Sequence, residues 1–390
     1  MAKFDFNNSG YARLWGSEEG TKLMQFILND PNMINSNITF WKEKFLVDPA
    51  ITPTDHKGLA TFRSEMREIT AAEMMDWRAP LADTRVEDKA DVAFYTGAII
   101  DFSTVGYKET AAGRFYKEKM FEQFGNDSLI VKQYVEEIQK KIDSRDQTLS
   151  HLGAQLMSTG KIIYKGGVGN KGAVYKADIP AENFIKAGEK VWSAEDCLLL
   201  TQMKEIEKSF RDKWGIDAPS QWEVTKNTFD NVVLKNKEVV DFIVQCRVLD
   251  NQVTTTGMTI NREMFYEHIS KFDGLSPIVI IEEKQRDKGT TVHGWDDKIA
   301  VWRPAGPAGM IRHAEILDSI VYPKYGAKSI SRVFTPMPDG LGVFVNTTLD
   351  NGGLQEWHTD FLVSAIPSLD EFLYHVVCDI TQAGTGPIGG

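Results

Sequence analysis

The fold of this 390-residue chain is decided by residues 128–159, SLIVKQYVEEIQKKIDSRDQTLSHLGAQLMST. The stretch contains no proline and a single glycine, Gly153, so it favours an uninterrupted helix. At a rise of roughly 1.5 Å per residue the helix would be about 48 Å long, more than the diameter of an ordinary small-domain core. Asp127 and Ser128 can cap its first turn, and Gly160 can end its last.

Apolar residues recur along one side of this predicted helix in steps of three and four. They are Val131, Val135, Ile138, Ile142, Leu149, Leu152 and Leu156, and Arg145 interrupts the stripe. A stripe on one side predicts a helix laid across a sheet, not a core helix wrapped on all sides. A coiled coil or helical bundle is the alternative, but a bundle needs further helices of this kind and the flanking sequence is rich in strand signals.

The composition, with 42% hydrophobic and 25% charged residues, is ordinary for a soluble globular protein. A net charge of −11 excludes a nucleic-acid binder that works by neutralising phosphates. Cys197, Cys246 and Cys378 are too scattered for a disulfide framework or a metal knuckle, which indicates synthesis in a reducing compartment. The sequence shows no signal peptide and no apolar run near the roughly 18 residues that span a bilayer, so we expect no membrane partner.

Two segments before the long helix lack the pattern of a self-sufficient core. Residues 1–55 are predicted to be an N-terminal arm with a helix over 17–29, lying along another surface; a partly disordered tail is the alternative. Residues 56–110 are predicted to form a long hairpin, with limbs from Phe62 through Ile69 towards Trp77 and from Val92 to Tyr107. A two-stranded ribbon is marginal alone in water, so a neighbouring copy of the chain would cover it. An ordinary pair of strands within a sheet is the alternative.

The remainder of the chain alternates strands and helices. A hairpin is predicted at 161–176; its glycine-rich turn lacks the spacing of a phosphate loop and leads into a strand, not a helix. Helices are expected at 193–213, 236–242 and 262–272, and strands at 221–225, 278–281 (a buried strand), 342–346, 360–363 and 372–377. This mixture predicts an α+β fold.

Signals of catalysis are weak. His293 with Asp296 and Asp297, and His358 with Glu356 and Asp360, bring imidazole and carboxylate groups together, but neither spacing matches a metal or nucleophile motif. We therefore predict no enzyme, no catalytic residue, no cofactor and no metal.

The order of elements resembles the major capsid protein of tailed double-stranded DNA bacteriophages. This is the HK97-like fold, and the chain looks most like its lambda-type capsid family. Three stretches carry the resemblance: residues 144–161 at the end of the helix, 297–309 with a strand and a Pro/Gly turn, and 365–370 before the last strand.

The resemblance implies a division of the chain. Its parts are an N-terminal arm at 1–55, an extended E-loop at 56–110, a peripheral domain at 111–192 with spine helix 128–159, an axial domain at 193–325, a return through the peripheral domain at 326–366, and a closing strand and C-terminal tail at 367–390. It also implies a structural subunit of the virion that self-assembles as hexamers and pentamers into an icosahedral shell around DNA. Portal and scaffolding proteins, with decoration proteins as an option, would be partners, and assembly would take place in the bacterial host cytoplasm.

The E-loop residues expected at the contact with a neighbouring subunit are Trp77, Arg78, Asp83, Arg85, Glu87, Lys89 and Tyr95. One member of the family cross-links Lys to Asn between subunits, but no motif places such a pair here. Because the chain begins at Met1, we expect a separate scaffold or none. The alternatives are an encapsulin-type nanocompartment shell that encloses a cargo enzyme, and an enzyme that uses the His293 or His358 segment.

Overall fold

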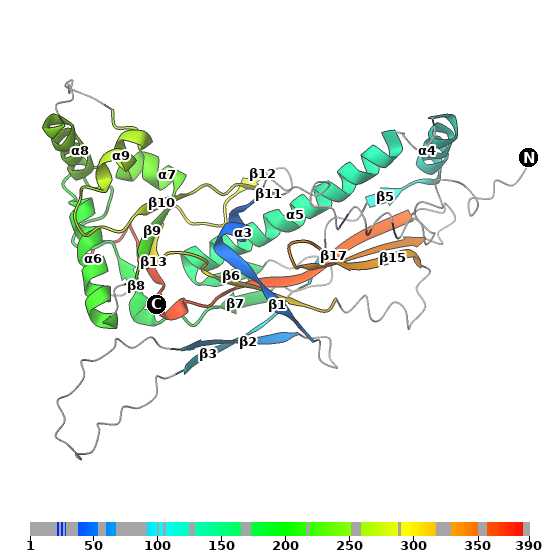
Figure 1. The fold of residues 1–390 in the computed structure, drawn as a ribbon, viewed down its shortest axis with the longest axis horizontal. Helices are drawn as coiled ribbons and strands as arrows, with labels where there is room; N and C mark the ends of the chain where they lie inside the picture. Colours follow the sequence, from blue (N-terminus) through cyan, green and yellow to red (C-terminus); the bar gives the residue numbers. More distant parts are fainter. Residues whose placement is uncertain are drawn as a thin grey trace, which may run out of the picture.

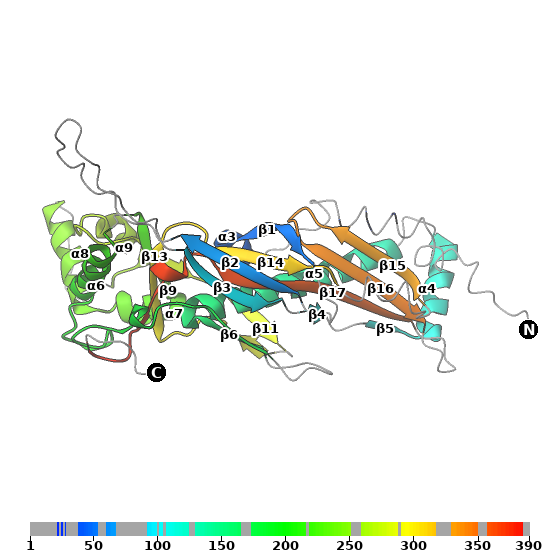
Figure 2. The same cartoon turned by 90° about the horizontal axis from the view of Figure 1, so that it is seen from below.

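The computed structural model describes residues 22, 25, 28, 38–53, 60–67, 92–99, 101–103, 107–124, 129–164, 173–215, 218–250, 259–287, 290–316, 329–349 and 357–384. These residues form an elongated body with a helical lobe at one end (Figures 1 and 2). A seven-stranded sheet runs along the body, and a five-stranded sheet lies in the lobe. The predicted α+β class is confirmed. None of the described helices is both long and apolar enough to cross a membrane.

The long helix α5 spans Leu129–Thr159 and confirms the predicted range. It ends at Gly160, whose left-handed φ of 67° favours glycine. The predicted caps Asp127 and Ser128 lie outside the described residues. Along the stripe, Val135 is half-buried and the following apolar members are buried: Ile138, Ile142, Leu149, Leu152 and Leu156. The side chain of Val131 is not among those described.

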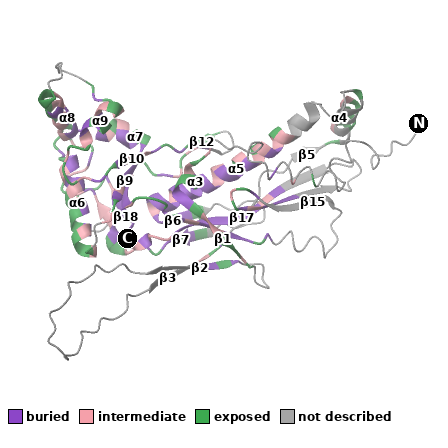
Figure 3. Ribbon diagram, in the orientation of Figure 1, coloured by how far each residue is buried: buried purple, intermediate pink, exposed green. Residues whose placement is uncertain are grey.

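The last turns of α5 correct the expectation of a helix covered on one side only. Ala154, Met157 and Ser158 are fully buried as well. Strands β6 (Lys161–Tyr164), β11 (Gln285–Asp287) and β13 (Ile299–Pro304) contact α5, in addition to the sheet below it. The helix therefore lies on a sheet for most of its length and enters the core at its C-terminal end (Figure 3).

The body sheet has the order β1-β14-β17-β16-β15, with β4 and β5 also pairing β17. Its strands are β1 (Phe45–Thr52), β4 (Asp101–Ser103), β5 (Tyr107–Glu109), β14 (Gly309–Ala314), β15 (Ser329–Pro336), β16 (Gly342–Leu349) and β17 (Trp357–Leu369). Among the described pairs of this sheet, β1 and β14 are parallel and the others are antiparallel. The predicted strands 342–346 and 360–363 are confirmed inside β16 and β17. α4 (Ala111–Phe124) lies at the end of the body far from the lobe (Figure 1).

Residues 38–53 of the predicted arm lie along the body of the same chain. α3 (Phe40–Lys44) packs against α5, and β1 is the edge strand of the body sheet. Trp41 and Phe45 are buried in the main core, because pairing with β14 satisfies the backbone while two aromatic side chains supply apolar area. In the predicted helix 17–29 only Lys22, Gln25 and Leu28 are described; all three are helical and Leu28 is buried.

The lobe sheet has the order β10-β9-β13-β18-β8. Besides β13, its strands are β8 (Phe184–Lys186), β9 (Ser220–Thr225), β10 (Ile278–Ile281) and β18 (Val376–Asp379). The helices of the lobe are α6 (Leu199–Trp214), α7 (Lys226–Thr228), α8 (Lys237–Leu249) and α9 (Arg262–Ile269), with a π-helical turn η3 (Phe229–Val233). Trp222 and Trp302 stand opposite each other on β9 and β13 in the centre of this second core.

The predicted elements of the lobe exist, but several boundaries move. α6 begins only at Leu199, after turns and a bend at residues 193–196. α8 runs on to Leu249, and α9 stops at Ile269. Strands 221–225 and 278–281 are confirmed, although β10 is an edge strand with two half-buried residues. The predicted strand 372–377 is wrong: Phe372–Tyr374 is the 3₁₀ turn η4, and β18 starts only at Val376.

Each of the two sheets contains strands from more than one of the segments predicted from the sequence. β8 precedes residue 193 and β18 follows residue 366, yet both belong to the lobe sheet. β14 lies within 193–325 and belongs to the body sheet. The predicted hairpin at 161–176 is confirmed by β6 paired with β7 (Ala173–Lys176), and its glycine-rich turn lies outside the described residues.

Candidate assembly surfaces

The first candidate surface is a two-stranded ribbon of β2 (Thr61–Arg67) and β3 (Val92–Ala98). The two strands are antiparallel and share seven residue pairs, and neither pairs with another described strand. Figure 1 shows the ribbon outside both sheets. The predicted pairing of these two limbs with each other is thus confirmed over the described residues.

The root of the ribbon is fixed in the core of the body. Ile99 N donates to Ala60 O over 2.8 Å, and both residues are buried. The ring of Phe62 packs 6.0 Å from that of Tyr175 on β7. Gly97 lies against both rings, and a Cβ there would come within 2.7 Å of each. The ribbon therefore leaves the body from a rigid point.

Six of the seven predicted contact residues lie outside the described residues: Trp77, Arg78, Asp83, Arg85, Glu87 and Lys89. Tyr95 lies on β3 opposite Ser64, and its side chain is not described. The predicted returning limb to Tyr107 is too long. β3 ends at Ala98, and 101–103 and 107–109 pair with β17 in the body sheet.

Exposed apolar side chains mark further candidate surfaces. They are Leu46 and Ile51 on β1, Phe115 and Tyr116 on α4, Ile163 and Val174 on β6–β7, and Leu198, Val248, Leu249 and Tyr266 in the lobe. Single exposed apolar residues are ordinary on a monomer. Ile163 and Val174 differ because they are direct cross-strand partners, 52% and 70% exposed, on one face of a hairpin. This pair is therefore a contiguous apolar patch and a candidate assembly surface.

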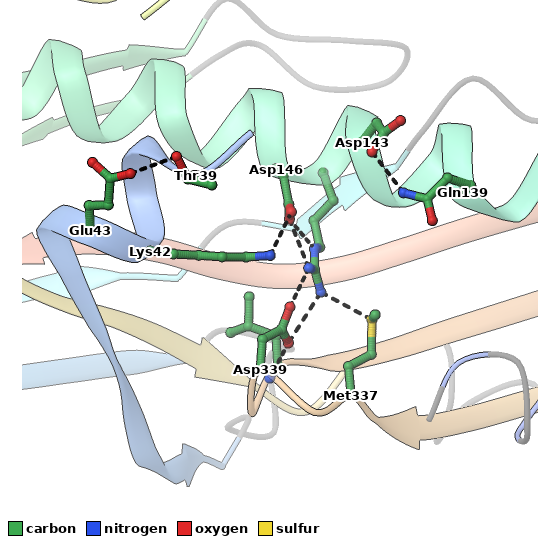
Figure 4. Close-up of polar contacts among 10 residues, drawn as sticks. Thr39, Lys42, Glu43, Gln139, Asp143, Asp146, Met337 and Asp339 are labelled. Atoms are coloured by element: carbon green, nitrogen blue, oxygen red, sulfur yellow. Dashed lines mark hydrogen bonds and ion pairs between the residues drawn. The ribbon is translucent and has the colours of Figure 1, made fainter. Parts of the chain in front are cut away.

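A buried ion cluster explains the one interruption of the α5 stripe. Arg145 donates through Nε to Asp146 over 2.8 Å and forms an ion pair with Asp339 in the turn between β15 and β16. Lys42 Nζ on α3 lies 3.2 Å from Oδ2, the second carboxylate oxygen of Asp146. Figure 4 shows Lys42, Asp146 and Asp339 converging between helix and strands. Arg145 thus joins α5 to the body sheet by charge where its neighbours in the stripe do so by apolar contact.

A second buried cluster joins the body to the lobe. Glu223 on β9 is completely buried and accepts from Lys44 Nζ over 2.7 Å and from Arg303 Nη2 over 3.0 Å. Burial alone would raise the pKa of Glu223, but the charges and hydrogen bonds of Arg303 and Lys44 lower it to about 2. Gln221 donates a further bond to the same carboxylate. Glu223 is therefore ionised at any ordinary pH.

A third cluster lies on β1. Arg312 on β14 donates to Asp48 over 2.6 Å and to Asp370 over 3.0 Å. Burial raises the pKa of Asp48, but the backbone bond from Ala50 and the ion pair with Arg312 lower it overall. Residues 38–53, here called the strap, thus place Lys42, Lys44 and Asp48 in three separate ion clusters. The sequence did not predict this role, although Trp41 and Phe45 on either side of Lys42-Glu43-Lys44 are a visible signal of a partly buried segment.

In the His293 segment, which the sequence offers as a catalytic alternative, the polar side chains form hydrogen bonds within the fold. His293 Nδ1 lies 2.9 Å from the Glu283 carbonyl oxygen, and Asp297 accepts from Thr225 over 2.5 Å. His358 and Asp360 lie on β17, and Glu356 lies outside the described residues. Within the described ranges, no group of three or more His, Cys, Asp or Glu side chains could hold a metal ion.

One further histidine is buried and structural. Burial lowers the pKa of His375 to about 4, although its bond with the Met157 carbonyl oxygen acts in the opposite direction. The ring is therefore neutral at neutral pH, and it joins the start of β18 to α5.

Comparisons with known proteins give structural similarity only. No protein-family model matches the chain, and no curated protein matches it. It is similar to a phage-related protein from Bordetella bronchiseptica RB50, at 11% identity over 92% of this chain and 99% of that chain, with a TM-score of 0.46. It is also similar to the putative capsid protein of a prophage of E. coli CFT073, at 11% identity over 84% and 82% of the two chains and a TM-score of 0.42.

A third similar structure is the mature capsid of bacteriophage PhiM1, at 10% identity over 88% of this chain and 87% of that chain, with a TM-score of 0.42. Two of these three structures are named as capsid proteins, the class that the order of elements in the sequence resembles. With scores this low and about one residue in ten identical, the similarity does not assign a function, which must come from the geometry of the chain itself.

Proposed function

We propose that the chain is the major capsid subunit of a tailed bacteriophage, a structural protein that assembles as hexamers and pentamers into an icosahedral shell around double-stranded DNA. The observation that carries the proposal is the β2–β3 ribbon. It pairs with no other described strand, and its described contacts with the body lie at its root. Because such a ribbon is marginal in water, the surface of a neighbouring copy would complete it.

The rest of the fold supports the same role. The ribbon and residues 68–91 would be the E-loop, with Arg78, Arg85 and Lys89 among its contacts, and α5 would be the spine helix. The body sheet with α5 would form the peripheral domain, and the lobe would form the axial domain around the centre of each hexamer or pentamer. An elongated body with a lobe at one end offers the long flat edges that a thin shell requires (Figure 2).

The charge of the chain fits an inert container. A subunit with a net charge of −11 does not neutralise phosphates, so packaged DNA would touch the wall without sequence-specific binding and could leave freely. In this role the chain would reside in the virion after assembly in the bacterial host cytoplasm. Its partners would be other copies of itself and the portal and scaffolding proteins.

The test is negative-stain microscopy of the full chain, expressed alone and together with the neighbouring genes of its source. The proposal expects uniform closed shells or hexamers in at least one condition. Extracted nucleic acid from the shells would support the capsid role, and a single enclosed protein would support the nanocompartment alternative. A chain that stays monomeric even with its scaffold would contradict both.

A further inference from the structure

A cleft of about 580 Å³ lies where the strap meets the lobe. Its walls come from residues 38–40 of the strap, from 225–227 and 230–231 after β9, from 281–285, and from the loop that carries His293, Trp295 and Asp297. The lining is acidic, since Asp230, Glu282, Glu283 and Asp297 outnumber Lys226 and Lys284. A volume of this size suits a small ligand or one long side chain.

Most of the acidic groups on the cleft already have partners. Arg262 donates to Asp230 over 2.9 Å and to Glu282 over 2.7 Å. Asp297 accepts from the Thr225 hydroxyl and from the Asn227 amide. These carboxylates are therefore structural.

Glu283 and Gln285 are different. Both are buried, with 5% and 6% of their surface exposed. Glu283 Oε1 accepts from the backbone N of Gly294 and Trp295, whereas Glu283 Oε2 and Gln285 Oε1 have no hydrogen-bond partner among the described residues. Residues 281–285 alternate between buried and exposed, which places Glu283 and Gln285 on the same side of the chain. Buried acceptors without donors are rare and costly, so the pair points to a donor that enters the cleft.

The lining selects among possible donors. The carboxylates disfavour an anion, and the described residues provide no group of three metal-binding side chains. Ile38, Phe40 and Trp295 add apolar surface beside the acceptors. A primary ammonium group on an alkyl chain satisfies all of these features, because it carries three N–H donors, a positive charge and methylene groups.

We propose that this cleft binds a primary alkylammonium cation, which donates to Glu283 and Gln285 while its alkyl chain lies against the apolar wall. The cation could come from a lysine side chain of a second copy or from a free diamine. The site is independent of the capsid role, because it rests on the cleft of a single chain.

The experiment is isothermal titration calorimetry of the full chain at constant ionic strength, with n-butylammonium chloride as the probe. Tetramethylammonium chloride is the matched control, since it carries the same charge and no N–H. We expect n-butylammonium to bind about tenfold or more tightly than the control. Equal binding of the two cations would overturn the proposal, because binding would then depend on charge alone and not on N–H donation to Glu283 and Gln285.

Two variants locate the binding site. Glu283→Gln keeps an oxygen for Gly294 and Trp295 but replaces the second oxygen by a donor, and should weaken n-butylammonium binding about tenfold. Glu282→Gln removes the same charge from a carboxylate already bonded to Arg262, and should change the affinity less than about threefold. If Glu283→Gln does not fold, Gln285→Glu provides the converse test and should tighten binding about tenfold. Wild-type affinity in Glu283→Gln, or unchanged affinity in Gln285→Glu, would contradict the site.

The same titration of assembled particles distinguishes the two sources of the cation. If a neighbour's lysine fills the cleft, assembled chains no longer bind n-butylammonium while unassembled chains do. If a free diamine is the ligand, both forms bind the probe, and 1,5-diaminopentane competes with it.

Discussion

The strap and the ribbon are both segments that the sequence marks as unable to form a core, and the structure treats them in opposite ways. The strap pairs in parallel with β14, buries Trp41 and Phe45, and places a charge in each of three ion clusters. Among the described strands, those of the ribbon pair with each other alone, and the described contacts of the ribbon with the body are at its root. The difference shows that a weak segment can find its partner inside its own chain. The ribbon is the segment for which we propose a partner in a neighbouring copy.

The largest expected effect comes from removing the charge that holds the strap to the lobe. Glu223→Gln leaves Arg303 and Lys44 facing a neutral amide in a buried site. We expect the free energy of unfolding of the unassembled chain to fall by about 3–5 kcal/mol, measured by urea denaturation. The matched control is Glu182→Gln, whose exposed pair with Lys213 contributes less than about 1 kcal/mol. Equal losses for the two variants would show that the strap is not fixed by buried charge.

Acid should release the strap in the same way. The pKa of Glu223 is lowered from 4.5 to about 2, so its stabilising effect is complete above pH 4.5 and is lost as the pH falls towards 2. The difference in unfolding free energy between wild type and Glu223→Gln should therefore shrink by about 3 kcal/mol over that range. A difference that stays constant down to pH 2 would contradict the ionised pair.

His375 also titrates in acid, and the variant His375→Gln separates its effect on stability from that of Glu223. The pKa of His375 is lowered from 6.5 to about 4. Between these pH values the histidine is protonated in the unfolded chain and neutral in the folded chain. Stability should therefore already fall between pH 6.5 and 4, and His375→Gln should remove this upper step alone.

A smaller effect is expected at the root of the ribbon. Gly97→Ala would place a Cβ within 2.7 Å of the rings of Phe62 and Tyr175. We expect a loss of about 1–3 kcal/mol in thermal unfolding of the unassembled chain, together with fewer closed shells in electron micrographs. Shell formation at the wild-type level would show that the direction of the ribbon is not set at its root.

The smallest effect should come from Lys42→Ala. Lys42 is partly exposed, and Asp146 keeps its bond from Arg145 in its absence. The expected change in unfolding free energy is about 0.2–1 kcal/mol, measured by urea denaturation. A loss as large as that of Glu223→Gln would mean that the Asp146 and Glu223 clusters contribute alike to holding the strap.

The spacing of apolar residues along the sequence was enough to predict several helices and strands. The range of α5, the strands inside β9, β16 and β17, and the self-paired ribbon all follow from repeats of two or of three and four residues. Strand ends and the 3₁₀ turn at Phe372–Tyr374 were missed, because alternation of apolar residues does not reveal where a turn interrupts it.

Long-range partners could not be predicted from the sequence. Lys44 and Glu223 are 179 residues apart, and Arg145 and Asp339 are 194 apart. A charge in an apolar stripe, such as Arg145, is visible in the sequence, but the residue that neutralises it is decided only by the fold. For the same reason the sequence placed the strap in an N-terminal arm without naming the surface that it covers, and gave no sign of the cleft beside it.

The most direct test of the central claim is hydrogen–deuterium exchange of the backbone amides, measured on unassembled chain and on assembled particles. Ladder amides of β1 should be protected in both states, because their partner β14 belongs to the same chain. Amides of β2 and β3 beyond the root should exchange quickly in the unassembled chain and become protected on assembly. Ribbon amides that are equally protected in both states would contradict the claim that a neighbouring copy completes the ribbon.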